Sequence, residues 1–201
     1  MKGYGLTFII AVATILAAVV FLATVSGSLW YAPDTEVPVP EQAKEFKARE
    51  VLLGDHPVRL RIPALQIDTH VQEVGVNALG NMASPSNFTD VGWYKLGPPP
   101  GLVGSAVITG HVDNALALDG VFKHLNEIRI DDDIFVDKKD GGTLNFKVTE
   151  IQKYPYTRVP LKTLFSRDDV PRLNLITCGG VWLPGAHSYD ERLIIYTELV
   201  Q

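Results

Sequence analysis

Residues 172–180 read RLNLITCGG, and this stretch decides the fold class of the chain. The run 172–177 is rich in aliphatic and β-branched residues, which favour a strand. Cys178 follows directly, and Gly179 and Gly180 allow the backbone to turn sharply. The sequence therefore predicts a strand that ends at a thiol.

Similar short runs lie on both sides of this strand, separated by Gly, Pro and Asp residues. Their alternating or continuous apolar patterns are typical of strands, and single helical turns are expected at 121–125 and 161–165. The expected strands are 58–62, 69–74, 105–109, 128–136, 144–151, 172–177 and 191–197. About eight strands with turn-rich connections favour a closed barrel, so residues 57–201 are predicted to form a mainly β, eight-stranded barrel with short helices.

The composition narrows the classes of function. The 201 residues correspond to one globular domain with an appendage, because domains usually contain about 100–200 residues. Eighteen Lys and Arg residues against 23 Asp and Glu residues give a formal net charge of −5, which excludes the basic surface that nucleic-acid binding needs. A single Cys excludes an internal disulfide and a Cys-based zinc site.

An apolar segment near the N-terminus predicts a membrane anchor. Residues 6–25 contain 17 apolar residues among 20, and no charged residue lies between Lys2 and Asp34. A helix of about 20 apolar residues matches the hydrocarbon thickness of a bilayer. Because a positive charge precedes the span and acidic residues follow it, we expect residues 1–5 in the cytoplasm, residues 6–26 in the membrane as a single span, and the remainder outside.

A cleaved signal peptide is the alternative, since small residues at 23–28 offer a cleavage site. The apolar run is longer than the usual 7–15 or so residues of a signal peptide, which favours a retained anchor. Residues 27–56 are predicted to form an extracytoplasmic stalk, because several prolines are followed by a helix-favouring run at 41–50.

Cys178 is a candidate nucleophile if a base and a cation lie nearby. An ordinary thiol with a pKa near 8.5 is little ionised at neutral pH, so an imidazole or a guanidinium must favour the thiolate. His111 follows an apolar strand and Gly110, which permits a tight turn and a close approach by a substrate backbone. Arg192 opens the last predicted strand, fourteen residues after Cys178, a separation that suits two neighbouring strands.

Each of these residues also has a structural alternative. Cys178 can be a small buried hydrophobe in a non-catalytic, membrane-tethered β-domain that binds a wall polymer or an exported protein. Arg192 can form a surface ion pair with a neighbouring acidic residue. His111 and Asp113 can be an H-x-D ligand pair of a metal hydrolase, although no companion His cluster has ligand spacing.

The three candidates stand in motifs that resemble a single family. Thr109-Gly110-His111, the LITC run at 175–178, and Arg192 before an apolar strand resemble the sortases, which are membrane-anchored cysteine transpeptidases. The resemblance covers residues 57–201. The L,D-transpeptidases fit less well, because they carry His-Gly-Cys where this chain has Ile-Thr-Cys.

Three further motifs indicate a sub-class within this family. They are the PPPG run at 98–101, GHVD at 110–113 and CGG at 178–180. These motifs resemble class F sortases most, with classes D and E as neighbours. Because no apolar span follows Gln201, the chain departs from the class C pattern, and we do not expect it to build pili.

The resemblance implies a sortase-type barrel and a two-step acyl transfer. It implies that Cys178 attacks an LPxTG-like sorting signal to form a thioacyl enzyme, that His111 acts as acid and then as base, and that Arg192 holds the oxyanion. The other residues expected to contact the substrate or the oxyanion are Thr177, Gly179 and Gly110. The segment between 151 and 173 resembles the loop with which the family grips its substrate.

The same resemblance implies partners and a location. The acyl donors are exported proteins with C-terminal sorting signals, the acceptor is an amine of the cell wall, and the catalytic domain lies on the outer side of the cell membrane. No cofactor is expected. Some sortases bind calcium through loop carboxylates, and residues 131–133 are acidic. Acidic residues are common in hairpin turns, however, and these lack EF-hand-like spacing.

Overall fold

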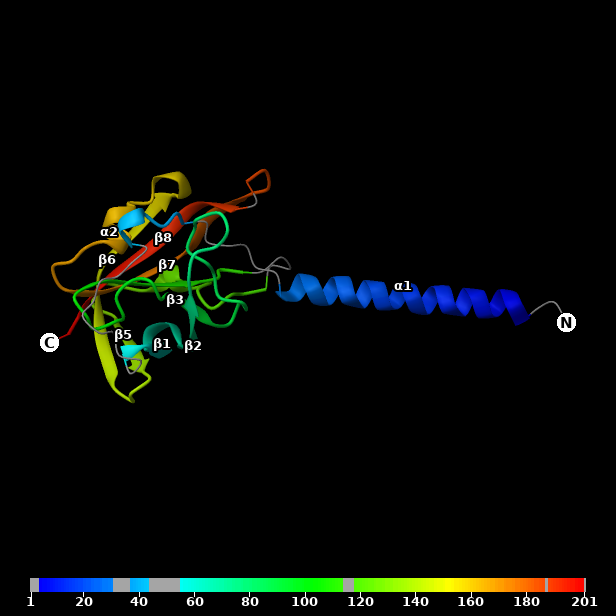
Figure 1. The fold of residues 1–201 in the computed structure, drawn as a ribbon, viewed down its shortest axis with the longest axis horizontal. Helices are drawn as coiled ribbons and strands as arrows, with labels where there is room; N and C mark the ends of the chain where they lie inside the picture. The colour runs from blue at the N-terminus through cyan, green and yellow to red at the C-terminus, as the bar shows by residue number, and fades with distance from the viewer. Residues whose placement is uncertain (1–3, 31–36, 44–54, 114–117, 187, 201) are drawn as a thin grey trace.

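Eight strands close into a barrel in the computed structural model, which describes residues 4–30, 37–43, 55–113, 118–186 and 188–200 (Figure 1). The strands are β1 (Pro57–Ile62), β2 (Ile67–Val74), β3 (Val91–Tyr94), β4 (Gly104–Gly110), β5 (Asp133–Lys138), β6 (Thr143–Pro155), β7 (Pro171–Leu183) and β8 (Ser188–Leu199). Their order around the barrel is β1-β2-β3-β4-β7-β8-β6-β5. The β2–β3 and β4–β7 pairs are parallel, and the other pairs are antiparallel. The predicted mainly β, eight-stranded barrel is confirmed.

Two strands differ from the sequence prediction. All four residues of β3 are buried, so this strand lacks the alternation that reveals a strand with one exposed face. The strand expected at 128–136 begins only at Asp133. Before it lies a turn, because Asp131 has a φ of 68° and the Asp132 carboxylate accepts a hydrogen bond of 2.8 Å from the Arg129 amide.

Short helices connect the strands, as the sequence predicts. α2 (Leu161–Phe165) occupies the helical turn expected at 161–165. The turn expected at 121–125 is shifted, because residues 121–124 form a non-helical turn that leads into the 3₁₀ helix η4 (Leu125–Glu127). The other 3₁₀ helices are η1 (Glu41–Ala43), η3 (Pro63–Leu65) and η5 (Tyr156–Arg158).

The strands β4, β7 and β8 are buried on both faces. Leu175 of β7 and Ile195 of β8 belong to the core inside the barrel, whereas Ile176 and Ile194 belong to a second cluster on the outside. Strand side chains alternate between the two faces, so the outer cluster covers every second residue. For this reason all seven residues of β4 are buried.

Residues 37–43 cover part of the outer cluster. Val37 and Val39 are buried, and their backbones form hydrogen bonds with Met82 (2.9 Å) and Gly80 (3.2 Å). Ala43, in η1, is also buried against this cluster. This part of the expected stalk therefore packs on the barrel. Of the helix expected at 41–50, η1 is described, and residues 44–50 lie outside the described part of the chain.

α1 (Tyr4–Trp30) is a single 27-residue helix that is drawn apart from the barrel in Figure 1. The expected membrane span, 6–26, lies within it. Among the residues whose side chains the structure describes, which in α1 are 9–22, no helix is long and apolar enough to cross a membrane.

An ion pair ties β1 to β5 where the barrel closes. Arg61 donates to both oxygens of Asp137, with Nη2–Oδ1 at 2.7 Å and Nε–Oδ2 at 3.1 Å. Thr143 of β6 donates to Oδ1 at 2.7 Å. These hydrogen bonds, with Arg61 as the main cause, lower the pKa of Asp137. A carboxylate with a lowered pKa stabilises the fold above its unfolded-state pKa, and the effect is lost as the pH falls through the folded-state pKa.

We predict that Asp137→Asn lowers the free energy of unfolding by about 1 kcal/mol near neutral pH, since the pair is partly exposed. The difference from wild type should shrink below about pH 4, where the wild-type carboxylate becomes protonated. Urea unfolding at several pH values measures this difference, with exposed Asp168→Asn as the control. A difference of the same size at all pH values would contradict the assignment.

Candidate active site

Strand register brings the three candidate residues into one row. In the antiparallel β7–β8 pair, Cys178 lies directly opposite Arg192. In the parallel β4–β7 pair, Thr109 is aligned with Ile176, and continuing this register by two residues sets His111 beside Cys178. Neighbouring strands lie about 4.8 Å apart, so the row spans about 10 Å between the backbones of its outer members. The structure thus gathers all three at one end of the barrel.

The three side chains also share one face of the sheet. Cys178 is two residues after Ile176, Arg192 is two before Ile194, and both isoleucines belong to the outer cluster. His111 likewise continues the outward series of Val107 on β4. Because strand side chains alternate, the thiol, the imidazole and the guanidinium project to the outer face of the barrel.

His111 is buried and held in place from two sides. Its side chain is 4% exposed, and Nε2 lies 3.1 Å from the carbonyl oxygen of Pro85. A carbonyl only accepts hydrogen bonds, so this contact assigns the proton to Nε2 and leaves Nδ1 as the basic nitrogen of the neutral ring. The backbone oxygen of His111 accepts a hydrogen bond of 2.9 Å from the Phe122 amide.

Cys178 is followed by a bulge and not by the sharp strand end that the two glycines suggest. β7 continues to Leu183, with a shift of register between Gly179 and Trp182. Gly180 has a φ of +80°, and a Cβ there would stand 2.0 Å from Oδ1 of Asp190. The strand continues because the bulge absorbs the turn that Gly180 permits.

Arg192 is fully buried, so it is not a solvated surface arginine. Nη1 donates to the carbonyl oxygens of Tyr189 and Glu191, both at 2.9 Å, and Nη2 donates to Oγ of Ser188 at 2.8 Å. The Tyr156 ring lies 5.7 Å from Cζ of Arg192. Together these contacts fix the plane of the guanidinium beside Cys178.

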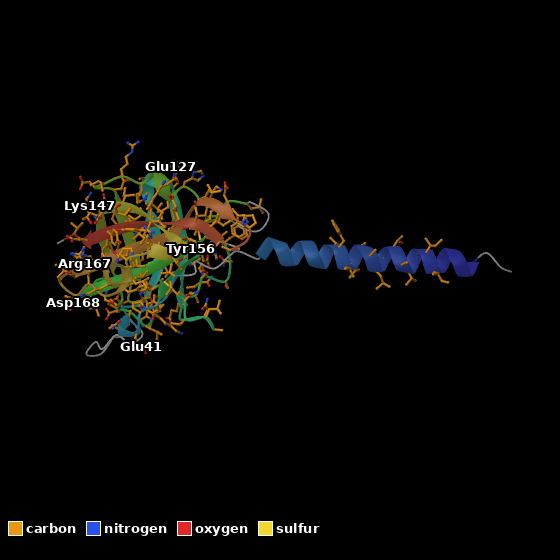
Figure 2. The ribbon with its side chains drawn as sticks, turned by 90° about the horizontal axis from the view of Figure 1, so that it is seen from above. Glu41, Glu127, Lys147, Tyr156, Arg167 and Asp168 are labelled. Atoms are coloured by element: carbon orange, nitrogen blue, oxygen red, sulfur yellow. The ribbon has the colours of Figure 1, made fainter. Side chains whose placement is uncertain are left out.

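Tyr156 and Tyr189 are neighbours of the site that the sequence analysis missed. Figure 2 shows Tyr156 away from Arg167 and Asp168, which lie at the other end of the barrel. The Tyr189 hydroxyl donates to the Asp113 carboxylate. Burial, followed by this bond to Asp113, raises the pKa of Tyr189. Asp113 could be noticed in the sequence because it lies two residues after His111. Nothing in the sequence indicates that Tyr156 or Tyr189 lies near the site.

Thr177 and Gly110 connect β7 with β4 by a hydrogen bond. The Thr177 hydroxyl donates to the carbonyl oxygen of Gly110 at 2.7 Å. A Cβ on Gly110 would stand 2.5 Å from Cδ2 of Phe122, so packing by this ring accounts for the glycine. Gly179 adjoins the thiol and lines the pocket described next.

A pocket of about 230 Å³ opens at the mouth of the barrel beside the thiol. Its lining includes Cys178, Gly179, Lys123, Lys153 and Tyr189. Thr177 and Leu193, which also line it, project to the inner face, opposite to the row of the three candidates. Cys178 therefore stands at the border between this pocket and the outer face.

The acidic turn is occupied by interactions within the protein. Asp133 lies 2.9 Å from Nζ of Lys147 and accepts a hydrogen bond of 3.0 Å from Asn145. The bond to Lys147 is the main cause that lowers the pKa of Asp133. Within the described ranges, no group of three or more His, Cys, Asp or Glu side chains is placed to hold a metal ion.

Comparisons with known proteins identify the family of the chain. The sortase domain family matches residues 60–200, which is more than half of the chain. No curated protein matches the chain in sequence.

Solved sortase structures share the fold. Sortase A from Corynebacterium diphtheriae superposes with a TM-score of 0.57 at 20% identity, covering 73% of this chain and 61% of that one. Sortase C-1 from Actinomyces oris gives 0.54 at 23% identity, with 72% and 75% covered. The pilus-related sortase C of Group B Streptococcus gives 0.58 at 14% identity, with 82% and 79% covered. This chain thus spans less than two thirds of the first of these proteins.

We predict that Gly120→Ala destabilises the fold by about 2 kcal/mol or more, because its Cβ would stand 2.3 Å from the backbone oxygen of His111 and 2.9 Å from the backbone carbon of Val112. Backbone atoms have no rotamer with which to move aside. Urea unfolding measures the loss. Gly185→Ala, whose Cβ would meet nothing within 4 Å, is the control and should stay within about 0.5 kcal/mol of wild type. Equal stability of the two variants would contradict the prediction.

Proposed function

Because this chain belongs to the sortase family of cysteine transpeptidases, we propose that it cleaves an LPxTG-like sorting signal through a thioacyl enzyme and transfers the acyl group to a cell-wall amine. The observation that carries the proposal is the row of His111, Cys178 and Arg192 across β4, β7 and β8. A nucleophile, a base and a fixed cation are the three groups that acyl transfer needs.

In the first step, His111 takes the proton of the Cys178 thiol, and the resulting thiolate attacks the carbonyl carbon of the scissile peptide bond. The tetrahedral intermediate collapses to a thioester, the C–N bond breaks, and the departing amine takes a proton from the His111 imidazolium. Arg192 stabilises the oxyanion that forms meanwhile. Its guanidinium is already desolvated and oriented by Ser188 and Tyr156, so little reorganisation accompanies the formation of the charge.

In the second step, an amine attacks the thioester carbon. The proton of the amine passes to His111, the C–S bond breaks, and Cys178 returns to the thiolate. The new amide bond joins the exported protein to its acceptor. Burial of the site slows competition by water, because His111 is 4% exposed and Cys178 is 7% exposed.

The sorting signal fits the outer face beside the row of three residues. Tyr154 at the end of β6, Val159, and Leu161 at the start of α2 are half-buried there and pack on the buried outer cluster. We propose that these apolar side chains contact the Leu-Pro part of the signal, and that the threonine carbonyl then reaches Cys178. Among the sub-classes, the PPPG, GHVD and CGG motifs support class F.

The location follows from the apolar N-terminal segment. We propose that residues 6–26 anchor the chain in the cell membrane with the N-terminus in the cytoplasm, and that the barrel faces the cell wall. Seventeen apolar residues among 20 and the 27-residue helix α1 support this topology.

We predict that the wild-type chain converts a sorting-signal peptide and hydroxylamine into a peptide hydroxamate, since hydroxylamine captures the thioester. Mass spectrometry over a panel of LPxTG-like peptides detects this product. Cys178→Ala should keep the wild-type melting temperature to within a few degrees, because the side chains have similar volumes, and should yield no hydroxamate. Hydroxamate from Cys178→Ala, or none from wild type with any peptide, would contradict the proposal and favour a non-catalytic binding domain.

We further predict that the full chain stays in the membrane fraction after carbonate washing. Replacing both Ile15 and Val19 by Arg should release it, because each Arg at the centre of a span costs about 2.5–3.5 kcal/mol. Leu79→Arg, at a site that is 81% exposed on the barrel, is the control and should stay in the membrane. Mature protein that begins at residues 23–28 would show that the segment is a signal peptide.

A further inference from the structure

We propose that the pocket at the barrel mouth binds the acceptor amine, and that Lys153 selects an acceptor whose amine is carried by a molecule with a free carboxylate. This inference rests on the proposed function and names the class of its second substrate: the side-chain amine of a diamino acid whose carboxylate is free. The pocket has about 230 Å³ and includes Cys178 in its lining, so a molecule within it touches the nucleophile.

The first argument is that the acyl chain and the acceptor need different spaces. In the thioacyl enzyme the acyl chain occupies the outer face, which His111 and Arg192 share. The inner side of the same strands offers the second space, because Thr177 lies opposite Leu193, and Leu193 lies opposite Lys153. The row of Thr177, Leu193 and Lys153 therefore begins next to Cys178 and crosses the mouth of the barrel. An amine that arrives along it meets the thioester from the side that the acyl chain leaves open.

The second argument is the charge of the lining. It includes two lysines and no acidic side chain. Lys123 is balanced, since its Nζ lies 3.8 Å from Asp113 and 3.7 Å from Asp119. Lys153 is exposed, and its ammonium has no ion-pair partner within 4.0 Å among the residues that the structure describes. A carboxylate on the acceptor would complete a pair with Lys153.

The same positive charge favours the reactive form of the amine. A neighbouring cation disfavours the ammonium state and thereby lowers the pKa of a bound amine. The neutral amine is the nucleophile that attacks the thioester. An acceptor without a carboxylate gains this effect but lacks the anion that holds it in the pocket, so it should react less efficiently at low concentration.

The third argument is the spacing along the row. Lys153 and Thr177 stand on either side of Leu193, so their backbones are two strand spacings, or about 10 Å, apart. In a lysine-type acceptor six bonds join the carboxylate carbon and the amine nitrogen, which is shorter than this span. The flexible Lys153 side chain reaches toward the carboxylate and covers the difference. Leu193 and Phe122 line the pocket between these ends and give the methylenes an apolar contact.

The experiment compares two acceptors that differ only in the carboxylate. Nα-acetyl-lysine and Nα-acetyl-lysinamide present the same side-chain amine, which is too far from the modified end for its own pKa to change much. Each is offered to the full chain with a peptide that yields hydroxamate, and the amide product is quantified at acceptor concentrations below saturation. We expect wild type to prefer the carboxylate acceptor about fivefold, the size of effect that one exposed ion pair produces.

Four variants decide the origin of this preference. Lys153→Met should bring the ratio close to one, and Lys153→Arg should retain it. Lys139→Met, at an exposed lysine on the β5–β6 turn, is the matched control and should keep the wild-type ratio. Lys123→Met should change the ratio less than Lys153→Met, because Lys123 is already paired. Lys139→Met should also form hydroxamate at the wild-type rate, because this lysine lies outside the pocket. For the pocket variants the two acceptors are compared on the same enzyme, so a change in its overall rate cancels in the ratio.

The outcomes separate this inference from the proposed function. A wild-type ratio near one, or a ratio that survives Lys153→Met, would overturn the inference while the hydroxamate assay still supports acyl transfer.

Protection of Cys178 from alkylation gives a second measurement that needs no peptide. Nα-acetyl-lysine should protect the thiol at lower concentration than its amide does, and Lys153→Met should remove the difference. Equal protection by both compounds would also overturn the inference.

Discussion

The site depends on the register of three adjacent strands. The parallel pairing of β4 with β7 and the antiparallel pairing of β7 with β8 place His111, Cys178 and Arg192 in one row. The hydrogen bond from Thr177 to the Gly110 carbonyl joins the first two strands at the row itself. A slip of one residue in either pairing would send a side chain to the opposite face, so the candidate site forms only in this register.

The row places polar groups in a buried environment, and the surrounding structure compensates for their desolvation. A buried guanidinium is costly unless hydrogen bonds replace its water, and Arg192 obtains three from Ser188, Tyr189 and Glu191. His111 contacts the Pro85 carbonyl. These partners all come from loops or strand ends, which explains why the site lies at the barrel end. The core inside the barrel is mainly apolar, and a buried hydroxyl such as that of Thr197 donates to a strand carbonyl, that of Leu173.

The thiol stands between two environments of different character. On the outer side, the half-buried Tyr154, Val159 and Leu161 pack on the cluster around Ile176 and offer apolar contacts to an extended peptide. On the inner side, the mouth pocket has about 230 Å³, and Lys153 gives it a positive charge. A transpeptidase must admit two substrates in turn without releasing the first, and two spaces that meet at one sulfur atom satisfy this requirement. The proposed acceptor selectivity follows from the difference between these two spaces.

The sequence by itself determined the strand-rich class, most strand positions, and the three candidate residues His111, Cys178 and Arg192, because period-two patterns and short motifs are local. It missed β3, whose four residues are buried on both faces and do not alternate. It also missed the roles of Tyr156 and Tyr189, and the packing of Val37 on the barrel. Only the tertiary structure decided these, because each depends on contacts between segments distant in the chain, and no local pattern encodes such contacts.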